Sequence, residues 1–235
     1  MNAIARTTSV GLARLPASAR LHDSGRDAWA AAVGHPMVAE IAAATLPHAK
    51  FRFYFEQNIA YLEDYARALA MIVAKAPDAD AIDVLGAALH QIVAVELPAN
   101  RSFLARLGGD PSAAGGTAVM EAVTYAYTRH LLATAALGDC ATGLASVLPC
   151  QWSYGEVGAA IAGARPEDPI YAEWVGIFGD PDYGGLVERT RGVLDRLAVA
   201  TGTAPERLQQ AFDLSTGYEV QFWDMAYGTV GTERR

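Results

Sequence analysis

The sequence has few basic residues and no long apolar run. Its 235 residues include 18 Lys and Arg against 26 Asp and Glu, which gives a formal net charge of −8 at pH 7. Because no basic block offsets this negative charge, we expect no binding to nucleic acid or to anionic membranes. Since no uninterrupted apolar run reaches the roughly 18 residues that cross a bilayer, we also expect no membrane-spanning helix.

Cysteine is scarce as well. The two thiols, Cys140 and Cys150, lie ten residues apart and form neither a CxxC pair nor a disulfide framework. Sparse, unpaired cysteines are typical of proteins in a reducing compartment. The sequence therefore predicts a cytoplasmic protein.

Metal and nucleotide motifs are also missing. No GxGxxG motif and no P-loop occurs. The five histidines are dispersed, and none belongs to an HExxH motif or to a Glu-x-x-His pair of the di-iron bundle type: His22, His35, His48, His90 and His130. We therefore expect a protein that binds no metal and works without a cofactor.

What the sequence does contain is helical periodicity. Alanine and leucine are abundant after residue 22, whereas alternating runs rich in isoleucine and valine are scarce. No repeat of 20–50 residues and no interdomain linker is apparent. With 52% hydrophobic residues, the chain is predicted to form one all-α bundle whose site is built from inward-pointing side chains. The spacing predicts helices over 27–33, 37–44, 48–75, 78–107, 117–137, 141–162, 170–178, 183–201 and 205–227.

The two ends of the chain are expected to lie outside this bundle. The first twenty residues carry three arginines, no acid, and no apolar core of the signal-peptide type. A transit-like segment is the alternative, but a flexible tail fits this composition better. We place a tail at residues 1–21, the helical domain at 22–228 and a second tail at 229–235.

The stretch LPCQWSYGE, from Leu148 to Glu156, combines a thiol, two aromatic rings and a carboxylate in nine residues. Cys150 and Tyr154 are four apart, so they lie on one face of a helix. Pro149 lacks an N–H and is predicted to kink or interrupt the helix beside the thiol. A lone cysteine on a helix is more often a small buried hydrophobe than a nucleophile, so the pattern alone leaves both interpretations open.

Polar residues at three other positions fall among apolar ones. Asn58 lies three residues before Tyr61, on the ring-bearing side of its predicted helix. Glu219 lies three residues before Phe222 among bulky apolar residues, where a carboxyl with a raised pKa could act as an acid; a surface glutamate is the alternative. Glu96 is interpreted as a solvated carboxylate, with a buried partner of the site as the alternative.

These candidate residues support one kind of chemistry. Thiol, tyrosine, asparagine and carboxyl groups on different helices suit covalent attack on a flat, electron-poor ring. Addition of sulfur pushes electron density onto a ring nitrogen, which a neighbouring carboxylic acid stabilises by giving up its proton. Of the tyrosines, only one of Tyr125 and Tyr127 can face the interior, because positions two apart on a helix point about 200° apart.

Four separated segments resemble the TenA family, also called thiaminase II or aminopyrimidine aminohydrolase. They are LPCQWSYGEVG, YEVQFWDMAY, HPMVAEIAAATLPHAKFRFYF and AYTRH, and the resemblance runs in order from Trp29 to Tyr227. It implies an all-α fold like that of heme oxygenase, assembled as a homotetramer. It also implies cofactor-free hydrolysis of 4-amino-5-aminomethyl-2-methylpyrimidine to hydroxymethylpyrimidine and ammonia in thiamin salvage, with thiamin as a second substrate.

The resemblance also implies roles for individual residues. Cys150 matches the nucleophile of the family, and Glu219 matches the glutamate that contacts the pyrimidine and handles its proton. The remaining matches concern rings around the substrate: Tyr127 near the thiol, Tyr61 and Phe222 enclosing the pyrimidine, and Tyr154 one turn below the cysteine.

Three positions depart from the family pattern. Asn58 stands where the family usually has an aspartate that binds the amino group and a ring nitrogen of the pyrimidine. Asparagine offers a carbonyl to an amino group but carries no charge. Phe178 replaces a frequent tyrosine of the substrate pocket, and Asn100 replaces a histidine that commonly follows the glutamate matching Glu96.

These departures leave competing interpretations beside the aminopyrimidine hydrolase. One is a pyrimidine-binding protein with little turnover, and another is a relative that acts on a different amine or heterocycle. A cofactorless oxidase on the same fold is a weaker fourth. The substitution Asn58→Asp is expected to strengthen binding if the pocket holds an aminopyrimidine, and to weaken it if the pocket is retuned for another ring.

Overall fold

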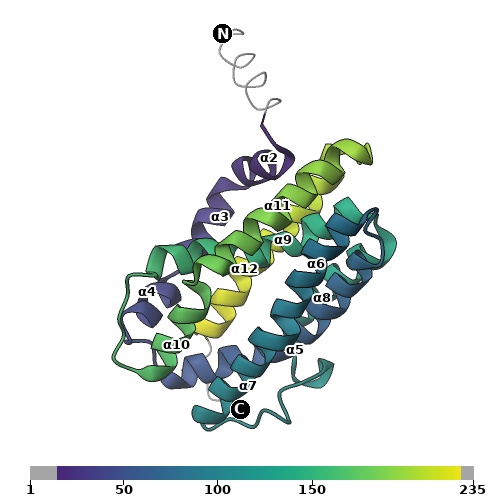
Figure 1. Ribbon diagram of the computed structural model, residues 1–235. Coiled ribbons are helices and arrows are strands. Elements are labelled where there is room, and N and C mark those ends of the chain that lie inside the picture. The colour runs from purple at the N-terminus through teal and green to yellow at the C-terminus, as the bar shows by residue number, and fades with distance from the viewer. Residues whose placement is uncertain (1–14, 229–235) are drawn as a thin grey trace.

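Every regular element that the computed structural model describes is a helix, which confirms the all-α prediction (Figure 1). The structure describes residues 15–228. In chain order the α-helices are α2 (Ala17–Ser24), α3 (Arg26–Val33), α4 (Pro36–Ala42), α5 (His48–Val73), α6 (Ala79–His90), α7 (Leu97–Arg106), α8 (Ala122–Leu137), α9 (Cys140–Ile161), α10 (Pro169–Phe178), α11 (Pro181–Ala200) and α12 (Pro205–Gly228). A π-helical segment, η1 (Gln91–Glu96), joins α6 to α7, and a short 3-10 turn, η2 (Thr117–Val119), precedes α8.

Helix α2 begins before residue 22, which is the start expected for the helical domain. Ala17, Ser18 and Leu21 are buried. The backbone N–H and the hydroxyl of Ser18 both donate to the Asp195 carboxylate of α11, at 2.7 and 3.1 Å. The residues from Ala17 onward therefore belong to the folded part of the chain. The rest of the predicted N-terminal tail, residues 1–14, and the predicted C-terminal tail lie outside the described residues.

Helix α9 lies at the centre of the bundle. It packs against α5, α8, α11 and α12, which surround it along its length (Figure 1). Every residue from Cys140 to Pro149 is buried, and a helix that is apolar all round is expected in such a position. Helix α9 therefore brings Cys150 into the interior, where the long helices meet.

Of the two predicted effects of Pro149, interruption of α9 does not occur, since one helix runs from Cys140 to Ile161. Hydroxyl groups from two other helices donate to carbonyls just before the proline. The Ser215 hydroxyl donates to the Ser146 carbonyl at 2.6 Å, and the Tyr65 hydroxyl donates to the Val147 carbonyl at 3.1 Å. Contacts from α5 and α12 thus hold the helix in place around a residue that would weaken it in isolation.

A proline shapes the stretch Ala79–Arg106 in a different way. Pro98 has no N–H for the carbonyl four residues before it, and the π-helical turn Gln91–Glu96 lies directly before this proline. A wider turn lets a later N–H reach the carbonyl that proline leaves unpaired. The helix predicted over 78–107 therefore contains a π segment, which ends at Glu96.

The same stretch is long and apolar enough, by length and composition alone, to cross a membrane. One face packs against α5 and α11. Ile82, Val93 and Val95 lie on its other side and are exposed. A single helix that passes this test also occurs in the cores of soluble bundles, so it assigns no membrane role to the chain.

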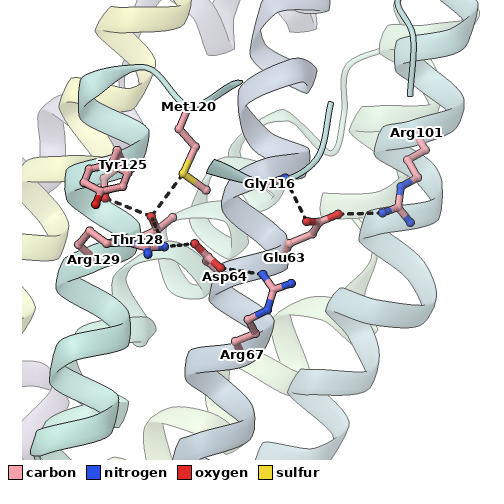
Figure 2. Close-up of polar contacts among 9 residues, drawn as sticks. All are labelled: Glu63, Asp64, Arg67, Arg101, Gly116, Met120, Tyr125, Thr128 and Arg129. Atoms are coloured by element: carbon pink, nitrogen blue, oxygen red, sulfur yellow. Dashed lines mark hydrogen bonds and ion pairs between the residues drawn. The ribbon is translucent and has the colours of Figure 1, made fainter. Parts of the chain in front are cut away.

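Helix α5 is tied to its neighbours by two adjacent carboxylates, Glu63 and Asp64 (Figure 2). Asp64 is buried between Arg67 of α5, at 2.7 Å, and Arg129 of α8. Glu63 accepts a hydrogen bond from Arg101 of α7 at 3.0 Å and another from the Gly116 N–H at 3.3 Å. These contacts fix the orientation of α5, and with it the direction in which Asn58 and Tyr61 point.

Candidate active site

The thiol predicted as a nucleophile lies beside the predicted acid. The Cys150 thiol of α9 lies beside the buried Glu219 carboxyl of α12, close enough for each group to shift the pKa of the other. The Tyr127 hydroxyl of α8 donates to Glu219 Oε1 at 2.6 Å. Tyr127 is 1% exposed and Tyr125 is 49% exposed, so the prediction that only one of the two faces the interior is confirmed. The consecutive helices α8 and α9 and the distant α12 thus bring a phenol, a thiol and a carboxyl together.

Burial controls the protonation of Glu219. It raises the pKa of this carboxyl from 4.5 to about 7, while the hydrogen bond from Tyr127 and the nearby Cys150 thiol offset part of the rise. Glu219 is 4% exposed, and no cation within residues 15–228 pairs with it. A carboxyl with a pKa near neutrality can both accept and donate a proton under ordinary conditions.

The thiol itself is held in its protonated form. Burial raises the pKa of Cys150 well above its usual value, the charge of Glu219 raises it further, and the nearby Tyr61 hydroxyl lowers it. Cys150 is nevertheless only partly buried. Because the thiolate is the reactive form, Cys150 needs a base, and Glu219 is in contact with it.

The second thiol of α9 has no such neighbours. Cys140 is buried, and its thiol donates to the Ile72 carbonyl at 3.6 Å. Burial raises the pKa of Cys140 to about 11. This is the environment of a small structural side chain, and it separates the two cysteines clearly.

Aromatic rings surround the thiol on the side of α5. The Tyr61 ring centroid lies 4.9 Å from that of Tyr127 and 5.7 Å from that of Phe222. The Tyr61 hydroxyl lies against Cys150 and Tyr127, although it forms no hydrogen bond of standard geometry with a described residue. The structure therefore brings together Tyr61, Tyr127 and Phe222, as the sequence predicts.

A second group of rings lies one turn along α9. The Tyr154 hydroxyl shares a hydrogen bond of 2.7 Å with Tyr54 of α5, and its ring packs 4.9 Å from Phe178 of α10. Gly158 allows α9 and α10 to approach, because a Cβ there would lie 1.8 Å from the Phe178 carbonyl oxygen. Sequence reasoning did not select Tyr54, although its position four residues before Asn58 could have marked it.

Asn58 and Asn100, two of the departures from the family pattern, contact each other. Asn58 Nδ2 donates to Asn100 Oδ1 at 2.9 Å, and Asn100 Nδ2 donates to the Glu96 backbone carbonyl at 2.7 Å. All three residues are buried. The sequence pattern gave no indication that these two positions, on α5 and α7, belong together.

Glu96 is not the solvated carboxylate that the sequence suggests. It is 6% exposed, and its Oε1 has no hydrogen-bond partner among the described residues. Burial raises its pKa from 4.5 to about 8, so the side chain stays neutral at pH 7. When it ionises, Glu96 raises the pKa of Cys150 and of Tyr183, so its carboxyl lies within electrostatic reach of both groups. Among the residues that the structure describes, no group of three His, Cys, Asp or Glu side chains could hold a metal ion.

Comparisons with known proteins agree with this geometry. The sequence profile of the TENA/THI-4/PQQC family matches residues 22–229. The chain is 32% identical to an aminopyrimidine aminohydrolase from Halalkalibacterium halodurans, over 89% of this chain and 95% of that protein. It is 31% identical to an aminopyrimidine aminohydrolase from Bacillus subtilis, over 86% of each. It also resembles the solved structure of a TenA homologue from P. horikoshii, with a TM-score of 0.80, 30% identity, and coverage of 91% of this chain and 99% of the other.

Proposed function

Because this chain belongs to the TENA/THI-4/PQQC family, we propose that it is a cofactor-free hydrolase of thiamin salvage. Its substrate is 4-amino-5-aminomethyl-2-methylpyrimidine, which it converts to hydroxymethylpyrimidine and ammonia, and thiamin is a second substrate. The names of the relatives support the substrate class. The observation that carries the proposal is the contact of the Cys150 thiol with a buried carboxyl whose pKa is about 7.

The Cys150–Glu219 pair supports a proton transfer that activates both sulfur and substrate. The ionised Glu219 takes the proton of the thiol beside it. The thiolate then adds to the ring carbon next to the substituted carbon, and Glu219 returns the proton to the ring nitrogen that receives the electron pair. Tyr127, which donates to Glu219 Oε1, keeps the carboxyl oriented through both steps.

The loss of ammonia that follows needs no further acid. The aminomethyl group is an ammonium near neutral pH. It leaves as ammonia when its C–N bond breaks and electrons from the ring form a double bond to the exocyclic carbon. Water adds to the exocyclic methylene carbon that remains and gives up one proton to the released ammonia. Sulfur leaves as the ring is restored, and the proton on the ring nitrogen returns through Glu219 to the thiolate. The net change is exchange of –NH₂ for –OH, with one water consumed and one ammonia released.

Asn58 is the observation that favours a second candidate function. A neutral amide binds an aminopyrimidine less strongly than a carboxylate does, by about 1 to 3 kcal/mol. This supports a pyrimidine-binding protein with little turnover, or a relative that acts on another amine. Ammonia release measured over a panel of thiamin fragments separates these alternatives from the hydrolase.

The variant Cys150→Ser tests the nucleophile. We expect it to fold normally and to release ammonia at least about a hundredfold more slowly, because the attacking group is lost. The matched control is Cys140→Ser on the same helix, which should leave turnover nearly unchanged. Near wild-type turnover in Cys150→Ser would remove covalent catalysis from the proposal.

The exposed apolar side chains of Ile82, Val93 and Val95 support assembly, which we propose to be a homotetramer located in the cytoplasm. Burying such a face against another copy removes apolar surface from water. Light scattering after size-exclusion chromatography measures the assembled mass. The variant Val93→Glu should lower that mass, and a monomeric wild-type chain would contradict the tetramer.

A further inference from the structure

The amide of Asn58 can present either of two opposite groups to a ligand. Its oxygen accepts hydrogen bonds and its nitrogen donates them, so the direction of the amide decides which substrate it recognises. The two atoms are similar in size, and the direction must be derived from the hydrogen bonds around them. A buried asparagine with no fixed neighbour could turn to suit either kind of ligand.

In this protein the direction is set by a backbone carbonyl. The Glu96 carbonyl can only accept, so Asn100 must turn Nδ2 toward it, at 2.7 Å. Asn100 Oδ1 then faces Asn58 and can only accept, so Asn58 must turn Nδ2 toward it, at 2.9 Å. Each bond fixes the next. The Asn58 oxygen is left without a donor among residues 15–228.

Asn58 lies on the same face of α5 as a residue of the candidate site. Asn58 lies one turn before Tyr61 on α5, and residues three apart share a face of a helix. The Tyr61 hydroxyl lies against Cys150, and its ring lies beside Tyr127 and Phe222. A ring bound between these side chains would meet the Asn58 oxygen at its edge.

We propose that Asn100 is a positioning residue that locks Asn58 with its oxygen toward the substrate, so that the site selects a ring with an N–H donor at this edge. The two asparagines form a matched pair, in which either one has its present effect only with the other in place. The inference rests on the proposed function, because an aminopyrimidine is the ring that supplies this donor.

The pair reverses the effect expected of an aspartate at position 58. An ionised aspartate has only acceptors, so in Asn58→Asp a carboxylate oxygen would face Asn100 Oδ1. Asn100 could turn to donate only by giving up its bond to the Glu96 carbonyl. The substitution should therefore weaken binding when made alone. A histidine at position 100, which the TenA resemblance leads one to expect, offers a ring N–H and should accommodate the aspartate.

A double-mutant cycle tests this coupling. The probe is 4-amino-5-hydroxymethyl-2-methylpyrimidine, the proposed product, whose dissociation constant calorimetry measures without turnover. The four full-length proteins are wild type, Asn58→Asp, Asn100→His and the double variant. We expect Asn58→Asp to weaken binding at least about tenfold, as for one lost hydrogen bond to a buried group, and the double variant to return to within about threefold of wild type.

Each outcome decides the inference. Binding by Asn58→Asp as tight as wild type, or a double variant no better than Asn58→Asp, overturns it. If Asn58→Asp does not fold, folding of the double variant supports the coupling between the two asparagines. If neither of these variants folds, Asn100→Leu provides the test instead. This apolar variant of similar size frees the Asn58 amide, and unchanged binding there also overturns the inference.

The failure of the proposed function would give a different result. If wild type does not bind the probe, the aminopyrimidine assignment falls. The coupling is then measured by the urea midpoints of the same four proteins. A double variant whose midpoint lies closer to wild type than that of Asn58→Asp supports the pair, and a midpoint lowered by the sum of the single changes overturns it.

Discussion

Asp64 and Glu219 are equally buried carboxyls in opposite settings. Asp64 of α5 lies between Arg67 and Arg129, where it ties two helices together (Figure 2). Glu219 meets a phenol and a thiol, with no cation beside it in the described part of the chain. A paired buried charge holds structure, whereas an unpaired carboxyl takes up a proton that it can exchange with its neighbours. Glu96 belongs with Glu219, since its pKa is about 8.

The largest expected difference is in catalytic rate. Glu219→Gln keeps the shape and the bond from Tyr127 but can neither take the thiol proton nor return it. We expect ammonia release to fall by about a hundredfold to ten-thousandfold, as for loss of a general acid–base group, while the pyrimidine still binds. Steady-state kinetics and calorimetry measure the two effects.

Asp64→Asn is the matched control for this rate loss. It makes the same change of acid to amide at an equally buried position, so its kcat per folded molecule should stay near that of wild type. A comparable rate loss in both variants would show that the comparison between paired and unpaired carboxyls has no functional meaning.

The raised pKa of Glu96 should make the stability of the protein depend on pH. Its folded pKa of about 8 lies above the ordinary 4.5, so between these values the folded chain holds a proton that the unfolded chain releases. The free energy of unfolding should therefore fall as pH rises through this range, by at most about 1.4 kcal/mol per pH unit from this one group. In Glu96→Gln, urea unfolding should show a smaller fall.

Between pH 5 and pH 8, the free energy of unfolding of Glu96→Gln should thus rise steadily relative to that of wild type. Asp64→Asn, measured in parallel, should show no such trend. If the curves for wild type and Glu96→Gln stay parallel across the range, Glu96 does not hold its proton in the folded state.

The smallest expected effect concerns the paired carboxyl itself. In Asp64→Asn the unfolding free energy should fall by only about 1 to 2 kcal/mol, because Arg67 and Arg129 reach solvent and can be hydrated when their partner is lost. Urea unfolding at pH 7 measures this loss. A loss of more than about 4 kcal/mol would mean that Asp64 holds α5 and α8 together to a greater extent than an ion pair with two partly exposed arginines allows.

The sequence predicts the helices well because their signals are local. Apolar spacing, together with the glycines and prolines that begin or end helices, identifies α3 to α12 to within a few residues, including α9 around Cys150. It misses the start of α2, whose burial depends on Asp195 more than 170 positions later. It also does not show that α9 continues through Pro149, because the hydroxyls that donate beside this residue come from α5 and α12.

Site residues that stand in a recognisable motif could be predicted from the sequence. Residues whose role depends on a partner from another helix could not. Cys150, Glu219 and Tyr127 stand in segments that resemble a family, and the structure brings them together. The burial of Glu96 and the bond between Asn58 and Asn100 depend on how α5 and α7 pack, which no periodicity reports. For this reason the expected effect of Asn58→Asp on aminopyrimidine binding changed, since the residue at position 100 determines whether the substitution strengthens or weakens binding.

The central claim is that Glu219 and Cys150 share one proton in the active form of the enzyme. The most direct test is the pH dependence of kcat/KM for ammonia release from 4-amino-5-aminomethyl-2-methylpyrimidine. Below the Glu219 pKa of about 7 both groups are protonated, so kcat/KM should fall about tenfold per pH unit on the acid side, and Glu219→Gln should lack this limb. A wild-type profile that stays flat from pH 5 to 8, or an acid limb unchanged in Glu219→Gln, would contradict the account.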